Sequence, residues 1–286
     1  MNFFDSIMLF LTSKAPAPTM FGALHIVTLI LCVVLTVLLC VFFKNSKDKV
    51  FRKVTFIFWI IIVVFEIYKQ LIYSFNYNET TNEVVWKYLP SQFPFQLCSM
   101  PLYVWPLLVF LKDGKVRDSL LAFNITFSFF GGLCTVIYPG DVFHEIIGRN
   151  VQTLLHHGLQ VVSGIFTFVF YRKKANFKFF ALGIIPFIIA LIMALSMNAI
   201  VEACYPNENG SKFWFNMFYL SPKLGCSLPI LNTIYGVYPK DRIIPYPAFL
   251  LIYTLGFVLV AFIMFVSMYG IYKLVKFIKK DKVNAN

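Results

Sequence analysis

The chain has 286 residues, of which 59% are hydrophobic and only 13% are charged, and its mean hydropathy is +0.75. Soluble domains carry about 25% charged residues, so this composition excludes an ordinary soluble protein and indicates an integral membrane protein. The net charge of +12 would suit a nucleic-acid-binding protein, but the basic residues form short clusters between apolar segments, as membrane-topology signals do. We therefore expect the membrane and its lipids as partners, and no nucleic acid.

Seven apolar segments are long enough to cross a bilayer, since about 20 helical residues span its hydrocarbon core. An amphipathic lead over residues 1–21 precedes them, and a long segment rich in proline and aromatic residues separates the last two. We predict an all-α fold, a polytopic membrane helix bundle of seven transmembrane helices that forms a single transmembrane domain over residues 1–286. The predicted spans are residues 21–43, 54–75, 93–111, 119–138, 151–171, 179–201 and 247–272.

The distribution of Lys and Arg predicts the orientation of these spans. The connections after the first, third and fifth spans, together with the C-terminal tail, hold 17 of the 25 basic residues. The opposite connections hold 7, and Lys69 lies inside a span. Because basic residues concentrate on the cytoplasmic side of membrane proteins, the N-terminus is expected outside and the C-terminus in the cytoplasm.

The predicted span at residues 93–111 contains an unusual polar insert. Gln96 and Cys98 lie near its start, between Pro94 and Pro101. Unpaired polar atoms and helix-loosening prolines are costly in a bilayer, so they mark a cavity or a contact between helices. We therefore expect a small polar site around Cys98.

Polar residues of other predicted spans lie at a similar depth, in the outer half of the bilayer. Ionisable groups at this depth cost several kcal/mol unless they face partners or water, which indicates one shared site. The candidate residues are Glu66, Lys69, Gln96, Cys98, Gln152, His156, His157, Gln160 and Asn198.

A cysteine and a histidine at the same depth can act as a nucleophile and its base: the imidazole accepts the thiol proton and the thiolate attacks an acyl carbonyl. His156 and His157 are about 100° apart on a helix, so both cannot face one target. Gln152, His156 and Gln160 share one helix face, which favours His156.

Three readings without catalysis stay open at this point. Glu66 and Lys69 are three residues apart and could simply neutralise each other, and an isolated buried cysteine is usually inert. The same polar pocket could bind a small solute in a transporter or a substrate-binding membrane subunit. It could also bridge the helices of a membrane scaffold, since polar side chains commonly hydrogen-bond across helices.

The sequence predicts no metal site and no nucleotide cofactor. The six cysteines have no metal-ligand spacing with histidine, and no glycine-rich phosphate-binding loop is present. Cys204 and Cys226 share one predicted external segment, which leaves a disulfide between them open.

Three motifs resemble those of the YwaF-like bacterial integral membrane family, whose members are relatives of transmembrane protein 164. They are LPSQFPFQLCSMPLYVWPLL at residues 89–108, HHGL at residues 156–159 and NMFYLSP at residues 216–222. The resemblance covers about residues 66–255, although residues 223–242 depart from the family pattern.

The resemblance implies an acyltransferase or lipid-remodelling enzyme that acts on phospholipid acyl chains in the cell membrane, here a bacterial plasma membrane. It gives Cys98 the role of nucleophile and implies His157 as the matched histidine, whereas the helix face favours His156. Both histidines are therefore candidates. The surrounding substrate-binding shell would contain Glu66, Lys69, Gln96, Gln160, Asn198 and Asn216, with no metal and no cofactor.

Overall fold

A computed structural model describes residues 2–78, 80–140, 142–204, 215–236 and 239–284 of the chain. Its α-helices are α1 (Phe3–Leu11), α2 (Ala23–Phe43), α3 (Asp48–Ser74), α4 (Pro101–Phe110), α5 (Lys115–Phe123), α6 (Phe129–Ile137), α7 (Ile147–Phe170), α8 (Phe177–Cys204), α9 (Leu231–Tyr235) and α10 (Tyr246–Asn284). The shorter elements are the strands β1 (Phe75–Asn78) and β2 (Glu83–Trp86), the 3-10 turns η1 (Pro90–Gln92), η2 (Leu97–Ser99), η4 (Met217–Tyr219) and η5 (Pro239–Asp241), and the π-helical turn η3 (Asn124–Ser128).

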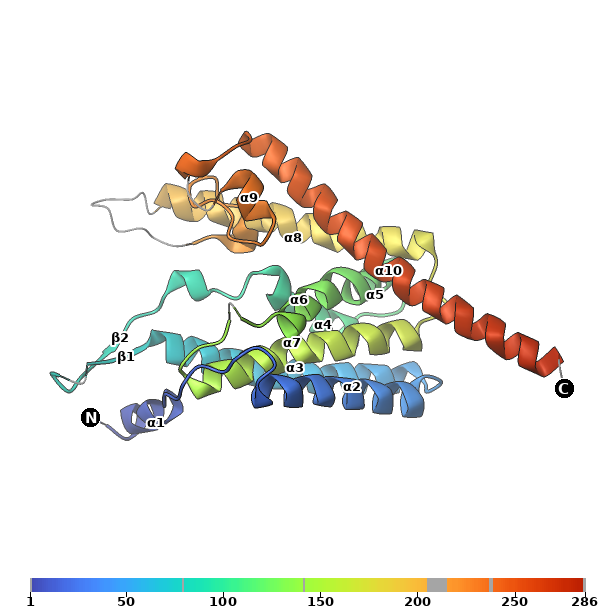
Figure 1. The fold of residues 1–286 in the computed structure, drawn as a ribbon, viewed down its shortest axis with the longest axis horizontal. Coiled ribbons are helices and arrows are strands. Elements are labelled where there is room, and N and C mark those ends of the chain that lie inside the picture. The colour runs from blue at the N-terminus through green and yellow to red at the C-terminus, as the bar shows by residue number, and fades with distance from the viewer. Residues whose placement is uncertain (1, 79, 141, 205–214, 237–238, 285–286) are drawn as a thin grey trace.

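The long helices α2, α3, α7 and α8 lie roughly along one common axis (Figure 1). Helix α7 packs against α2, α3 and α6, while α8 packs against α5. The short helices α4, α5 and α6 lie between the α2–α3–α7 group and the α8–α10 pair (Figure 1). Helix α10 crosses the bundle obliquely, and its C-terminal part extends beyond the other helices (Figure 1).

Five helical segments in the described part of the chain are long and apolar enough to cross a membrane. They are residues 23–43, 115–137, 147–170, 177–204 and 246–278. The structure thus supports a mostly helical, multi-pass membrane protein. The count of seven spans and their orientation stay predictions. The span predicted at residues 54–75 forms part of α3, a 27-residue helix with Glu66 and Lys69 inside it.

The span predicted at residues 93–111 is not one continuous helix. Only residues 97–110 form an apolar helical stretch, which at 1.5 Å per residue is about 20 Å long, against about 30 Å of hydrocarbon. Pro94 cannot donate a backbone hydrogen bond, and Pro101 occupies the first position of α4, where a proline is tolerated. The prolines therefore confine the helix to the half of this segment beyond Cys98.

Part of the connection between the second and third predicted spans forms an antiparallel hairpin of β1 and β2. Trp86 of the hairpin stacks on Phe4 of α1, and its indole donates a hydrogen bond to Asp5. Helix α1 and the hairpin therefore lie together at one end of the molecule (Figure 1).

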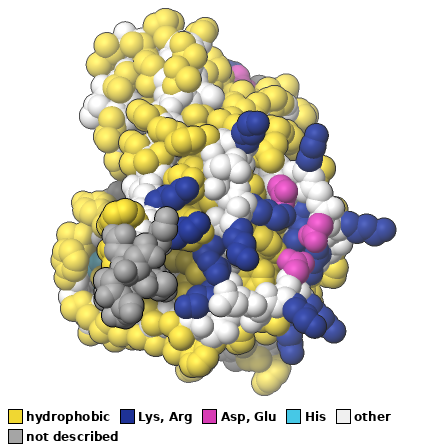
Figure 2. Space-filling view, turned by 90° about the vertical axis from the view of Figure 1, so that its right-hand side faces the viewer, with side chains coloured by type: hydrophobic (Ala, Val, Ile, Leu, Met, Phe, Trp, Pro, Cys, Tyr) yellow, Lys and Arg dark blue, Asp and Glu magenta, His cyan; other side chains and the backbone are white. Residues whose placement is uncertain are grey.

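The opposite end of the molecule is basic. Figure 2 shows Lys and Arg side chains gathered on this end, where the connections α2–α3, α4–α5 and α7–α8 meet. Beneath them Arg117 is only 1% exposed and donates hydrogen bonds to Asp48 (3.0 Å) and to the Tyr171 hydroxyl (2.8 Å). This network, termed here the basic-end network, joins α3, α5 and the end of α7.

Candidate active site

Cys98 lies in the 3-10 turn η2, directly before α4, and is half-buried. Two glycines of α6, Gly131 and Gly132, allow this helix to pack closely against η2 and α7. A Cβ added at Gly131 would lie 3.5 Å from the Cα of Cys98, and one added at Gly132 would lie 2.5 Å from the Cβ of Gln160. Gly132 therefore leaves the space that lets α7 bring Gln160 toward Cys98.

Two side chains of α7 converge on the backbone carbonyl of Cys98. The Nε2 atom of His156 lies 2.9 Å from this oxygen, and the side-chain amide of Gln160 donates a second hydrogen bond to it. His156 is 3% exposed and Gln160 is fully buried. The predicted polar stripe of α7 thus faces Cys98, with Gln152 at its start also buried.

The same contacts determine which polar atoms of His156 and Gln160 remain free. A carbonyl oxygen only accepts hydrogen bonds, so His156 carries its proton on Nε2 and presents an unprotonated Nδ1. Among the described residues, neither Nδ1 of His156 nor Oε1 of Gln160 has a hydrogen-bond partner. Both are buried acceptors, and such groups are normally paired with a protein group, water or ligand.

His157 has a different environment. Its Nδ1 atom lies 2.7 Å from the carbonyl oxygen of Thr153, one turn earlier in the same helix, and its side chain is half-buried. The rings of His156 and His157 are 5.4 Å apart. Within the described residues, neither histidine hydrogen-bonds the Cys98 thiol, and His156 is the one that contacts the Cys98 residue.

Glu66 and Lys69 form an ion pair of 2.8 Å on α3. Gln70 also donates to Glu66 (2.5 Å) and to the carbonyl of Gln92 (2.7 Å), which leaves Oε2 of Glu66 buried and without a partner in the described chain. The charges of Lys69 and Glu66 both act on Cys98, with opposite signs, and the charge of Lys69 also acts on both histidines. Glu66 and Lys69 therefore neutralise each other and also belong to the electrostatic environment of Cys98.

Gln96 and Asn198 hold the backbone of the loop around η4. The Gln96 amide donates to the carbonyl of Asn216 (2.8 Å) and accepts from the N–H of Phe218 (2.7 Å). The Asn198 amide donates to the carbonyl of Met217 (3.0 Å), and its oxygen accepts from the N–H of Met217 (2.8 Å). These amides fix the loop against η2 and α8.

Asn216 stabilises the same loop from within. Its amide donates to the carbonyl of Gly225 (2.8 Å), and its oxygen accepts from the N–H of Ser221 (2.7 Å). Phe218 and Tyr219 have φ values of 56° and 57°, a left-handed conformation that is costly for bulky residues and persists only where surrounding contacts hold it. We refer to residues 216–221 as the clamped loop.

The clamped loop is joined to the segment of Cys98 by the two hydrogen bonds of Gln96, a relationship that the sequence did not indicate. Burial raises the pKa of the Tyr219 hydroxyl to about 12, with further contributions from the nearby Cys98 and Cys226 thiols.

Asn124, a polar residue that lies away from the candidate site, is fully buried and forms hydrogen bonds with Trp105, Ser163 and Thr167, so it supports the core.

The cysteines are free thiols in this structure, including Cys204, which is exposed, and Cys226, which is buried. A disulfide between these two is therefore not formed. No group of three or more His, Cys, Asp or Glu side chains in the described ranges could hold a metal ion.

The fold and the site together define a multi-pass helical membrane protein in which one helix places a buried histidine against a cysteine of a broken apolar segment. The model of the TMEM164 family matches residues 20–272, so the chain belongs to the TMEM164 family. No curated protein and no solved structure matches the chain.

Proposed function

We propose that the protein is a membrane acyltransferase that moves an acyl chain between phospholipids, with Cys98 as nucleophile and His156 as general base. One observation carries the proposal. The Nε2 atom of His156 is fixed 2.9 Å from the carbonyl of Cys98, which leaves an unpartnered basic nitrogen, Nδ1, within the site. A neutral imidazole with a free basic nitrogen beside a cysteine supports the proposal, because such a nitrogen can accept the thiol proton once the thiol turns toward it.

The proposed reaction has two steps. In the first step, Nδ1 of His156 accepts the thiol proton, the sulfur of Cys98 attacks the ester carbonyl, and the bond to the glycerol oxygen breaks. His156 then returns the proton to this oxygen, so a lysophospholipid leaves and a thioester remains. In the second step, the hydroxyl of another lysophospholipid loses its proton to His156 and attacks the thioester, which regenerates the thiol.

Electrostatic stabilisation of the oxyanion is assigned to Lys69. The amide nitrogens of Gln96 and Asn198 do not serve this role, because they donate to carbonyls of the clamped loop. The ammonium of Lys69 is held by Glu66; both charges act on Cys98 with opposite signs, and the contribution of Lys69 is the larger of the two. A positive charge in a site of low dielectric stabilises a developing oxyanion far better than it would in water.

We further propose that the site opens toward the outer leaflet. Helix α4 leads from Cys98 toward Leu111, whose carbonyl accepts a hydrogen bond from Arg52 of the basic end. Cys98 therefore lies on the side of the bundle away from the basic end. Placing the basic end in the cytoplasm puts Cys98 in the outer half of the bilayer.

The test is acyl capture by the full-length protein in nanodiscs. A phosphatidylcholine with a radiolabelled acyl chain is added, and the protein is assayed for a label that neutral hydroxylamine removes. We expect such a label in the wild type and none in Cys98→Ala. Cys134→Ala is the matched control, because this thiol is exposed and belongs to α6.

Absence of the label in the folded wild type, with unchanged lipid composition in cells that carry Cys98→Ala, would contradict the proposal. A label that Cys98→Ala retains would place the chemistry on another residue. In the first case, binding assays with small polar solutes would test the transporter alternative.

A further inference from the structure

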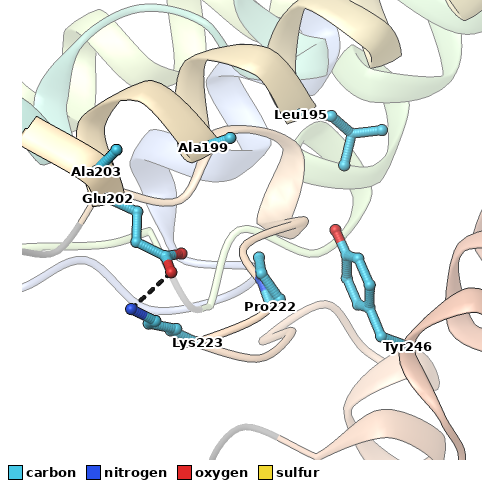
Figure 3. A pocket seen from close by; sticks show the side chains of 7 residues that line it. All are labelled: Leu195, Ala199, Glu202, Ala203, Pro222, Lys223 and Tyr246. Atoms are coloured by element: carbon cyan, nitrogen blue, oxygen red, sulfur yellow. Dashed lines mark ion pairs between the residues drawn. The ribbon is translucent and has the colours of Figure 1, made fainter.

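A groove lies beside the clamped loop, on the side of α8 and α10. It has a volume of about 460 Å³, within the range of small-molecule sites. Figure 3 shows Leu195, Ala199 and Ala203 along the α8 wall, with Tyr246 across the groove. Pro222, from the segment between these helices, lines it as well. The walls are therefore mainly apolar.

One ion pair interrupts this apolar lining. Glu202 and Lys223 lie 2.6 Å apart, and Figure 3 shows them together along one edge of the groove. Their side chains are 29% and 59% exposed, so both charges are accessible from outside. A neighbouring positive and negative charge complement a ligand that carries one charge of each sign.

The position of the groove in the fold indicates access from the bilayer. Helices α8 and α10 both belong to the segments that can cross a membrane, and the groove lies where α8 ends and α10 begins. The surface of α8 next to the groove is apolar and open, since Ile192 is 55% and Ile200 is 61% exposed. A tyrosine at such a helix end is typical of the membrane interface, which places Tyr246 at the level of the lipid head groups.

We propose that this groove binds a zwitterionic glycerophospholipid from the surrounding bilayer. Lys223 would pair with the phosphate, Glu202 with the ammonium group, and the start of one acyl chain would lie along Leu195 and Ala199. Charge-assisted contacts of this kind are the strongest that the groove offers. Lipid binding in this groove does not depend on the proposed acyl transfer. The proposed function enters only if the bound lipid is also a substrate of that reaction.

The clamped loop connects the groove with Cys98. The hydroxyl of Tyr246 donates a hydrogen bond of 2.7 Å to the carbonyl of Leu220. On the other side of the loop, Phe218 binds Gln96, which lies two residues before Cys98. A lipid in the groove would thus contact the same loop that is joined to the segment of the proposed nucleophile.

The experiment uses the Cys98→Ala protein in nanodiscs, so that no turnover is needed and failure of the acyl-transfer proposal does not affect the result. The probe is a phosphatidylcholine with a diazirine near the carbonyl end of one acyl chain. Cross-linked peptides are quantified by mass spectrometry, and a diacylglycerol with the same chain serves as the probe without a head group.

We expect the phosphatidylcholine probe to label residues 195–203 and to label them more than the diacylglycerol does. Lys223→Glu should reduce this labelling about tenfold, because a charge-assisted contact becomes a repulsion. Ala199→Trp should block the groove, whereas Ile200→Trp, on the lipid-exposed surface, should leave labelling unchanged. The double variant Glu202→Lys/Lys223→Glu keeps an ion pair and serves as a folding control.

Equal labelling by both probes, or labelling that Lys223→Glu and Ala199→Trp leave unchanged, would show ordinary contact with bulk lipid and overturn the proposal. Thermal stability of each variant is measured in the same nanodiscs, so that loss of folding is recognised separately.

Discussion

His156 contacts Cys98 through the backbone: Nε2 of the imidazole lies 2.9 Å from the Cys98 carbonyl oxygen. The orientation of His156 consequently does not depend on the thiol. This separates the chemistry of the cysteine side chain from the packing of α7 against η2, and substitutions can address each one alone.

Cys98→Ser should keep the fold and lose the chemistry. The hydrogen bonds of His156 and Gln160 to the backbone carbonyl remain, so we expect the melting temperature in detergent to stay close to that of the wild type. Hydroxylamine-labile acyl labelling should disappear, since a serine cannot form a thioester. A strong loss of thermal stability would instead indicate a structural role for the thiol.

His156→Gln should remove the base and preserve the contact. The glutamine amide can still donate to the Cys98 carbonyl, but it has no basic nitrogen in place of Nδ1. We expect the initial rate of acyl labelling to fall about 10²- to 10⁴-fold, the usual contribution of a general base. His157→Gln is the matched control and should fall far less. The reverse order would assign the base to His157.

The two glycines of α6 provide a packing test. Gly132→Ala places a Cβ 2.5 Å from Gln160 and 2.8 Å from the carbonyl oxygen of His157, so either α7 or α6 must shift. Overpacking of this kind costs about 1–3 kcal/mol. Gly131→Ala, whose nearest contact is 3.5 Å, should be nearly neutral. Thermal unfolding in detergent compares the two, and equal effects would contradict the packing described here.

Asn198→Ala should release the clamped loop. It leaves both the N–H and the carbonyl of Met217 without their partner, and each unsatisfied buried group costs about 1–3 kcal/mol. We expect faster amide hydrogen exchange in residues 216–221, with little change in α2. Asn76→Ala, an exposed residue of the hairpin, is the control. Normal protection of the loop in Asn198→Ala would favour a substrate-binding role for Asn198 over a structural one.

The basic-end network should make stability depend on pH. Burial alone raises the pKa of the Asp48 carboxyl, but hydrogen bonds from Tyr171, Arg52 and Arg117 outweigh it, so the pKa is lowered from 3.8. A lowered pKa contributes stability that is present above the unfolded-state value and is lost as the pH falls through the folded-state value.

Asp48→Asn tests this dependence. The difference in melting temperature between the wild type and Asp48→Asn should be greatest near pH 7 and should shrink as the pH falls toward 3.8 and below. The melting temperatures are measured by intrinsic fluorescence in one detergent across the pH series. A difference that stays constant over this range would contradict the assigned role of Asp48.

The positions of several helices could be predicted from the sequence, because the hydrophobicity of neighbouring residues indicates a membrane-spanning helix. Long apolar runs indicated the helices at 23–43, 147–170 and 177–204, and the spacing of Gln152, His156 and Gln160 indicated a polar face of one helix. Pro94 and Pro101 also signalled irregularity before α4, although the actual extent of the break was not predicted.

The sequence by itself determined a membrane protein of apolar helices that carry a few polar residues, because hydrophobicity and helical periodicity are local properties. Only the tertiary structure decided which polar atoms meet. Gln96 binds a loop about 120 residues further along the chain, and His156 meets a carbonyl and not a thiol. Such pairings depend on how distant helices pack, down to the single missing Cβ of Gly132, and no short stretch of sequence encodes them.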